Sequence, residues 1–165
     1  MKLYKFDDNK KISVFQLSDS SLISVKNHLY NITGKTIQDT IIIMYDYNNE
    51  TCWNLGDQLR TDDEMKENTA CFISKIEEYL ATRPGISFFE FKEPGENFNK
   101  IKKYNNSILT DKNLELYHFF FKERCVCGNS ILILPDGRYI FTRSDAHINA
   151  LYYTSKQIEE LLKVR

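Results

Sequence analysis

Residues of types that could support catalysis gather just after a predicted hairpin near the C-terminus. Arg143, Asp145 and His147 lie within five positions, and an aspartate can orient a neighbouring histidine as a general base. His118, in an aromatic run, is a second histidine that a carboxylate could activate. These residues define one function class, a small hydrolase or transferase. Residue types this common give the pattern little specificity, and simple loop polarity is the favoured interpretation.

Other catalytic and nucleotide-binding motifs are missing from the sequence. It contains no G-x-x-x-x-G-K-[ST] phosphate loop, G-x-G-x-x-G turn, G-x-S-x-G elbow or H-E-x-x-H pair. The run Lys100-Ile101-Lys102-Lys103-Tyr104 mixes cations with an aromatic ring, as proteins that bind single-stranded nucleic acid do. One such cluster in a chain of net charge -1 is far from a basic footprint. We therefore expect no cofactor, and nucleic acid is a disfavoured partner.

The cysteines and the first residues bear on the cellular compartment. Of the four cysteines (Cys52, Cys71, Cys125 and Cys127), two form a C-x-C rather than the C-x-x-C of zinc and thioredoxin-like sites. Charged residues interrupt positions 1–8 before an apolar signal segment could form, and no apolar run approaches the roughly 20 residues of a membrane-spanning helix. The sequence predicts a cytoplasmic protein with reduced thiols, no metal and no membrane contact. Whether the C-x-C has a function stays open.

Charge is unevenly distributed along the chain. Residues 61–99 hold nine acidic and four basic residues, a net charge of -5, whereas residues 100–165 hold seven acidic and eleven basic residues, a net charge of +4. The acidic excess is expected on the outward side of a helix after Thr61 and on the strand behind it. The five carboxylates predicted to contact a partner are Asp63, Glu64, Glu67, Glu77 and Glu78.

The helix that would carry these carboxylates is the clearest element of the sequence, over residues 62–82. Thr61 and Glu64 match a T-x-x-E capping box, and acidic residues in the first turn complement the helix dipole. Its apolar residues recur with helical period and define an inner stripe: Met65, Thr69, Phe72, Ile73, Ile76 and Leu80.

The remaining pattern predicts mainly short strands. Strands are expected over 2–6, 11–18, 40–47 and 86–91, and a hairpin over 130–134 and 138–143 around Pro135-Asp136-Gly137. A helix is expected over 20–33, capped by Asp19 or Ser20 and ended by Gly34, and another after the T-x-x-Q box at Thr154. Residues 94–113 are predicted as loop with a short helical turn, and residues 114–122 fit a strand or a helix.

This pattern indicates one α+β domain over residues 1–165. Its strands cluster at hairpin spacing and its helices do not alternate regularly with them, which favours a largely antiparallel sheet with about three helices packed on it. A chain of this length lies within the usual range of a single domain.

An acidic helix face on a small chain without catalytic motifs favours a binding protein over an enzyme. Nuclease toxins have basic clefts that hold phosphates, and an acidic helix could occupy such a cleft in place of the substrate. We therefore predict an immunity protein that neutralises a bacterial toxin, with electrostatic steering from the helix. Trp53, Tyr152 and Tyr153 are candidates for apolar anchors, although core packing is the simpler use of each.

Overall fold

The computed structural model describes residues 11–49, 59–98, 100–125, 127–143 and 149–163. Its centre is a six-stranded mixed sheet with the strand order β1-β6-β5-β2-β3-β4. The strands are β1 (Ile12–Gln16), β2 (Thr40–Asp46), β3 (Ile86–Lys92), β4 (Leu109–Thr110), β5 (Asn129–Ile133) and β6 (Arg138–Arg143). The predicted α+β class is confirmed. The predicted strand 2–6 lies outside the described residues.

The sheet is largely antiparallel, as predicted, but it is mixed rather than purely antiparallel. β1, β6, β5 and β2 pair antiparallel, whereas β2 with β3 and β3 with β4 pair parallel. The parallel pairing arises because α3 (Asp62–Ala81) lies between β2 and β3 in the chain, and a crossover through a helix returns the second strand in the same direction. The sequence does not reveal this β–α–β unit because most of the predicted strands lie at hairpin spacing.

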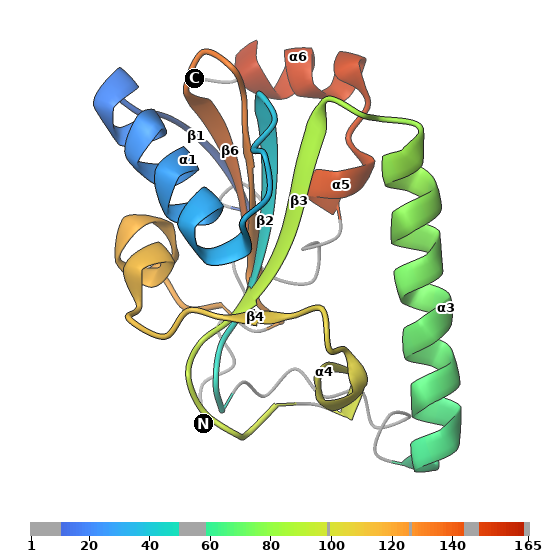
Figure 1. Cartoon of the computed structure of the whole chain (residues 1–165). Helices are drawn as coiled ribbons and strands as arrows, with labels where there is room; N and C mark the ends of the chain where they lie inside the picture. The colour runs from blue at the N-terminus through green and yellow to red at the C-terminus, as the bar shows by residue number, and fades with distance from the viewer. Residues whose placement is uncertain (1–10, 50–58, 99, 126, 144–148, 164–165) are drawn as a thin grey trace.

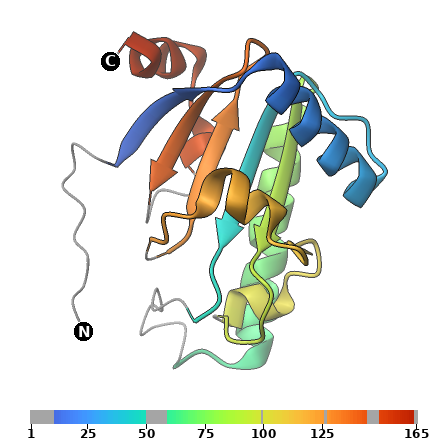
Figure 2. The ribbon, with the colours of Figure 1, turned by 90° about the vertical axis from the view of Figure 1, so that its left-hand side faces the viewer.

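Helices cover both faces of the sheet (Figure 1). On one face lie α1 (Asp19–Thr33) and a π-helical turn, η2 (Tyr117–Phe121). Residues 114–122, for which the sequence fits a strand or a helix, are therefore partly helical. On the other lie α3, α5 (Asn149–Tyr152) and α6 (Ser155–Lys163), and Figure 2 shows α3 behind the sheet and α1 in front of it. The loop predicted over 94–113 contains α4 (Lys100–Tyr104), next to α3, and β4.

The helix boundaries follow the predicted signals closely. The capping box at Thr61 is present, Gly34 ends α1 with φ 65°, and Thr154 exchanges hydrogen bonds with Gln157 before α6. The N-cap of α1 is Ser18 rather than Asp19 or Ser20, since its Oγ accepts the Ser21 amide at 3.2 Å. Serine at this position satisfies a donor that the first turn would leave free.

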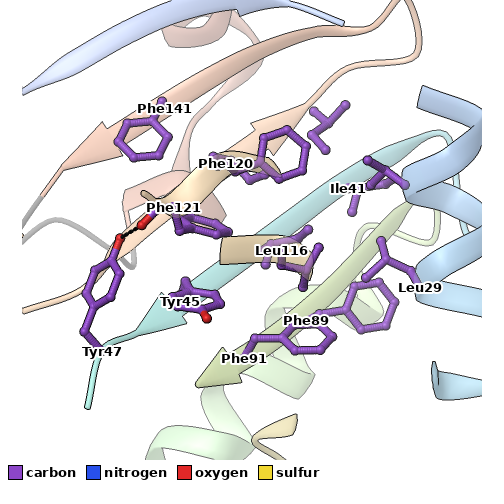
Figure 3. Packing of buried hydrophobic residues seen from close by; sticks show 14 residues of the cluster. Leu29, Ile41, Tyr45, Tyr47, Phe89, Phe91, Leu116, Phe120, Phe121 and Phe141 are labelled. Carbon is purple, nitrogen blue, oxygen red and sulfur yellow. Dashed lines mark hydrogen bonds between the residues drawn. The ribbon is translucent and has the colours of Figure 1, made fainter. Parts of the chain in front are cut away.

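The two faces of β2 enter two separate cores because successive side chains of a strand point in opposite directions. Ile41, Ile43 and Tyr45 pack under α1 and η2, where Tyr45 stacks on Phe121 at 4.6 Å between ring centroids (Figure 3). Ile42 packs with Leu132 and residues of α3, α5 and α6 on the opposite face. Within the described parts of the chain, no helix is both long and apolar enough to cross a membrane.

Candidate functional site

The outward side of α3 carries four of the five predicted contact residues, which we call the acidic stripe: Asp63, Glu67, Glu77 and Glu78. At 100° per residue they fall within a sector of roughly 100°. Met65, Thr69 and Ile76 are buried on the opposite side, which directs the stripe away from the sheet. The structure therefore places these four predicted residues together on one exposed surface.

The acidic stripe is poorly neutralised. Asp63 lies 3.2 Å from Lys66 Nζ, an exposed i,i+3 pair. Glu67, Glu77 and Glu78 form no ion pair with any residue that the structure describes. Exposed charges of this kind project a field that falls off over a Debye length of about 8 Å at physiological salt.

Glu64, the fifth predicted contact residue, has a structural role. Its Oε2 accepts the backbone N–H of Thr61 at 2.7 Å, and its own N–H donates to Thr61 Oγ1 at 3.3 Å. The hydrogen bonds from Thr61 lower the pKa of Glu64 below its ordinary value. A carboxylate held this way is committed to starting α3 and is the least available of the five for a partner.

The sequence also predicts exposed acidic residues on the strand behind α3, but the carboxylates found there are buried or paired. Glu90 is buried in β3, and Glu93 pairs with Arg124 at 2.7 Å. Several cations of the basic C-terminal third are neutralised in the same way, among them Arg143 by Glu123 and Arg138 by Asp136. The Arg143 and Arg138 pairs lie within the basic third and leave its net charge unchanged, whereas the Glu93–Arg124 pair joins the acidic and basic segments. The acidic stripe remains exposed.

A buried polar cluster lies at the carboxyl ends of β2 and β3, where the sequence gives no motif. Lys102 Nζ of α4 lies 2.7 Å from Asp46 Oδ2, and the side chains are 10% and 7% exposed. Asn105 donates its amide to Glu90 Oε2 at 2.9 Å. Burial raises the pKa of Glu90, although the charge of Lys102 and the Asn105 hydrogen bond act in the opposite direction. The parallel pairing of β2 and β3 is what brings Asp46 and Glu90 close together.

The raised pKa of Glu90 predicts a pH-dependent stability. Because folded Glu90 holds its proton to higher pH than unfolded Glu90, its contribution is fully present below the ordinary value of 4.5 and is lost as pH rises through the folded pKa. Glu90→Gln keeps the side-chain shape and does not ionise, so the variant should gain stability relative to wild type as pH rises through this range. Urea unfolding from pH 4 to 8 measures the difference. A difference that does not change with pH, or that changes in the opposite sense, contradicts the prediction.

The histidines proposed for catalysis are not joined to a carboxylate in the described structure. His118 is exposed on η2, and its ring contacts Tyr117 edge-on at 5.3 Å. Asp145 and His147 lie outside the described residues. The histidine–carboxylate pair that does form is His28 Nδ1 with Glu115 Oε2 at 2.8 Å, and Nε2 of His28 is buried without a hydrogen-bond partner. Since a general base needs a reachable nitrogen, this pair has the geometry of a packing contact between α1 and the segment before η2.

The cysteines depart from the expected reduced state. Cys127 is disulfide-bonded, whereas Cys71 is an exposed free thiol on α3. Cys125 is buried, with its Sγ 3.8 Å from the carbonyl oxygen of Glu123. The expectation of reduced thiols is therefore wrong for Cys127. Among the described residues, no group of three or more His, Cys, Asp or Glu side chains is arranged to hold a metal ion.

The predicted aromatic anchors have different environments. Tyr153 is buried, with its hydroxyl 3.1 Å from Thr142 Oγ1, so it belongs to the core. Tyr152 is 42% exposed and contacts Tyr79 of α3 edge-on at 5.0 Å. Trp53 lies outside the described residues. Of the three, Tyr152 is the described side chain that offers an apolar contact near α3.

Comparison with known proteins gives a distant structural likeness. The chain matches no family model and no curated protein. Among solved structures it is similar to a secreted Mycobacterium tuberculosis disulfide oxidoreductase homologous to E. coli DsbE, at 12% identity and a TM-score of 0.38, over 70% of this chain and 83% of that one. A likeness this weak carries no functional argument, so the site must be interpreted from its own residues.

Proposed function

We propose that this protein binds and inhibits a basic protein partner, most simply as an immunity protein against a bacterial toxin of the nuclease type. The observation that supports the proposal is the acidic stripe, in which Glu67, Glu77 and Glu78 are exposed and unpaired among the described residues. A nuclease cleft must attract phosphates, so its positive potential also attracts this helix face. Charge complementarity of this kind speeds association and excludes partners of the wrong sign.

Location is part of the same proposal. We place the protein in the cytoplasm, where an immunity protein would protect the cell that makes the toxin. The disulfide at Cys127 is more typical of oxidising compartments, because cytosolic reductants keep most thiols reduced. Fractionation of the producing cells should therefore accompany any search for the partner.

Charge reversal on the acidic stripe tests the proposal. The whole chain is immobilised at low salt, proteins captured from the producing organism are purified, and each is assayed for nuclease activity with and without the chain. For an inhibited protein, Glu67→Lys/Glu77→Lys/Glu78→Lys should raise Kd by about 100-fold or more, since three attractions become repulsions. Wild-type Kd should rise steeply with salt.

The matched control is Asp39→Lys/Glu159→Lys/Glu160→Lys, which makes the same total charge change at exposed carboxylates outside α3. This control should leave Kd within about threefold of wild type, because none of its carboxylates lies on α3 and their charges are screened. Inhibition that survives reversal of the acidic stripe contradicts the proposal. So does an equal loss in both triple variants, or capture of no protein whose activity the chain inhibits.

A further inference from the structure

A polar cavity of about 360 Å³ lies beside α4, where β3 and β4 end. Lys92 and Thr110, the last residues of these parallel strands, line it together with Lys102 and Lys103 of α4. In open sheets, ligands bind beyond the carboxyl ends of parallel strands, where backbone and loops leave a crevice. Figure 1 shows α4 at the end of the sheet opposite α6.

The cavity carries two cations that no carboxylate neutralises. Lys102, which also lines the cavity, forms an ion pair with the buried Asp46 and interacts electrostatically with Glu90. Lys92 Nζ lies over the Phe98 ring at 4.8 Å, and Lys103 Nζ over the Tyr104 ring at 5.3 Å. Neither of these two lysines pairs with an acid among the described residues, so both ammonium groups remain available to a ligand.

The other lining groups favour the same ligand chemistry. Thr110, which is partly buried and carries a hydroxyl, also lines the cavity. The carboxylate that lines the cavity belongs to Glu96, which is exposed and therefore screened by water. Two point charges and a hydroxyl suit a compact dianion, and lysine ammonium groups bind phosphate as point charges.

We infer that this cavity binds the phosphate group of a small phosphorylated molecule, held by Lys92, Lys103 and Thr110. The volume lies within the range of small-ligand sites, about 300–1,000 Å³, and leaves room for a substituent beyond the phosphate. The site belongs to the end of the sheet and α4 rather than to the acidic stripe. It stands whether or not the chain inhibits a toxin.

Amide NMR of the whole chain tests this inference with inorganic phosphate, adenosine monophosphate and adenosine as probes, at constant ionic strength. Both phosphates should cause saturable shifts at residues 92, 103 and 110, and adenosine should cause none there. Lys92→Gln/Lys103→Gln should weaken phosphate binding by about tenfold or more, because each lysine makes a charge-assisted contact. Glu96→Gln should strengthen binding.

Two controls separate specific binding from general attraction. Lys156→Gln/Lys163→Gln removes the same charge from exposed positions of α6 and should leave the affinity within about twofold, since those positions are distant from α4. Lys92→Arg/Lys103→Arg retains both charges and should retain binding. Absence of saturable shifts with either phosphate, equal shifts with adenosine, or equal weakening by the α6 control overturns the inference.

Discussion

Replacing Lys102 with methionine is expected to lower the free energy of unfolding by about 3–5 kcal/mol, since removing one partner of a buried ion pair leaves the other charge uncompensated. Lys102 Nζ lies 2.7 Å from Asp46 Oδ2, and both side chains are at most 10% exposed. Glu90, also buried, interacts with the same ammonium group. Methionine fills a similar volume, so the loss would report charge rather than packing.

The neighbouring Lys103 provides a matched control on the same short helix. Its side chain is exposed and lies over the Tyr104 ring, so Lys103→Met should change stability by no more than about 0.5 kcal/mol. Guanidinium unfolding followed by circular dichroism measures both variants. Adding Asp46→Asn to Lys102→Met should restore much of the lost stability, because the side chain at position 46 then carries no charge without a partner. Equal effects of the two lysine variants would show that the ion pair is not buried in solution.

The difference between Lys102 and Lys103 cannot be predicted from the lysine-rich sequence. Three lysines within four positions suggest a solvated loop, and the sequence alone treats them alike. In the structure, Lys102 is a buried ion-pair partner while Lys103 is exposed, because α4 turns one side toward the ends of β2 and β3. Local pattern cannot make this distinction, since the partners Asp46 and Glu90 are distant in the chain.

Local signals did predict the elements that carry the acidic stripe. Thr61 and Glu64 start α3 where the capping box requires, and the apolar period places Met65 and Ile76 inward. The stripe follows as the opposite side of the same helix. Glu64 shows the limit of this reasoning. The sequence predicts it as a partner contact, but its side chain forms the capping hydrogen bonds at the start of α3.

Long-range pairing accounts for most of what the sequence did not predict. The parallel register of Met44 with Glu90 and of Asp46 with Lys92 depends on the crossover through α3, which a strand pattern does not encode. The helical form of residues 115–121 depends on Asp111, whose carboxylate accepts hydrogen bonds from that segment. Aromatic composition in this run equally fits a strand, so tertiary contacts decide.

Asp111→Ala is the second substitution with a large expected effect, a loss of about 3–5 kcal/mol. The Asp111 side chain is buried, and it accepts three hydrogen bonds: Oδ1 from the Glu115 amide at 3.0 Å, and Oδ2 from the Tyr117 amide at 2.9 Å and the Tyr45 hydroxyl at 3.1 Å. Alanine leaves these three donors without their acceptor. Desolvation and the charge of Asp111 raise the pKa of Tyr45, so this hydroxyl remains a donor at neutral pH.

Asp111→Asn and Asp39→Ala show whether the carboxylate itself is responsible. Asparagine keeps one acceptor oxygen, so it should lose less stability than alanine. Asp39 pairs with Lys26 at the surface and is 82% exposed, so its removal should cost at most about 1 kcal/mol. Because Tyr45 stacks on Phe121, loss of the Asp111 contacts should also weaken near-UV circular dichroism and speed hydrogen exchange over residues 115–121. An Asp111→Ala protein with wild-type stability and unchanged exchange in this segment would show that η2 is held by its aromatic packing alone.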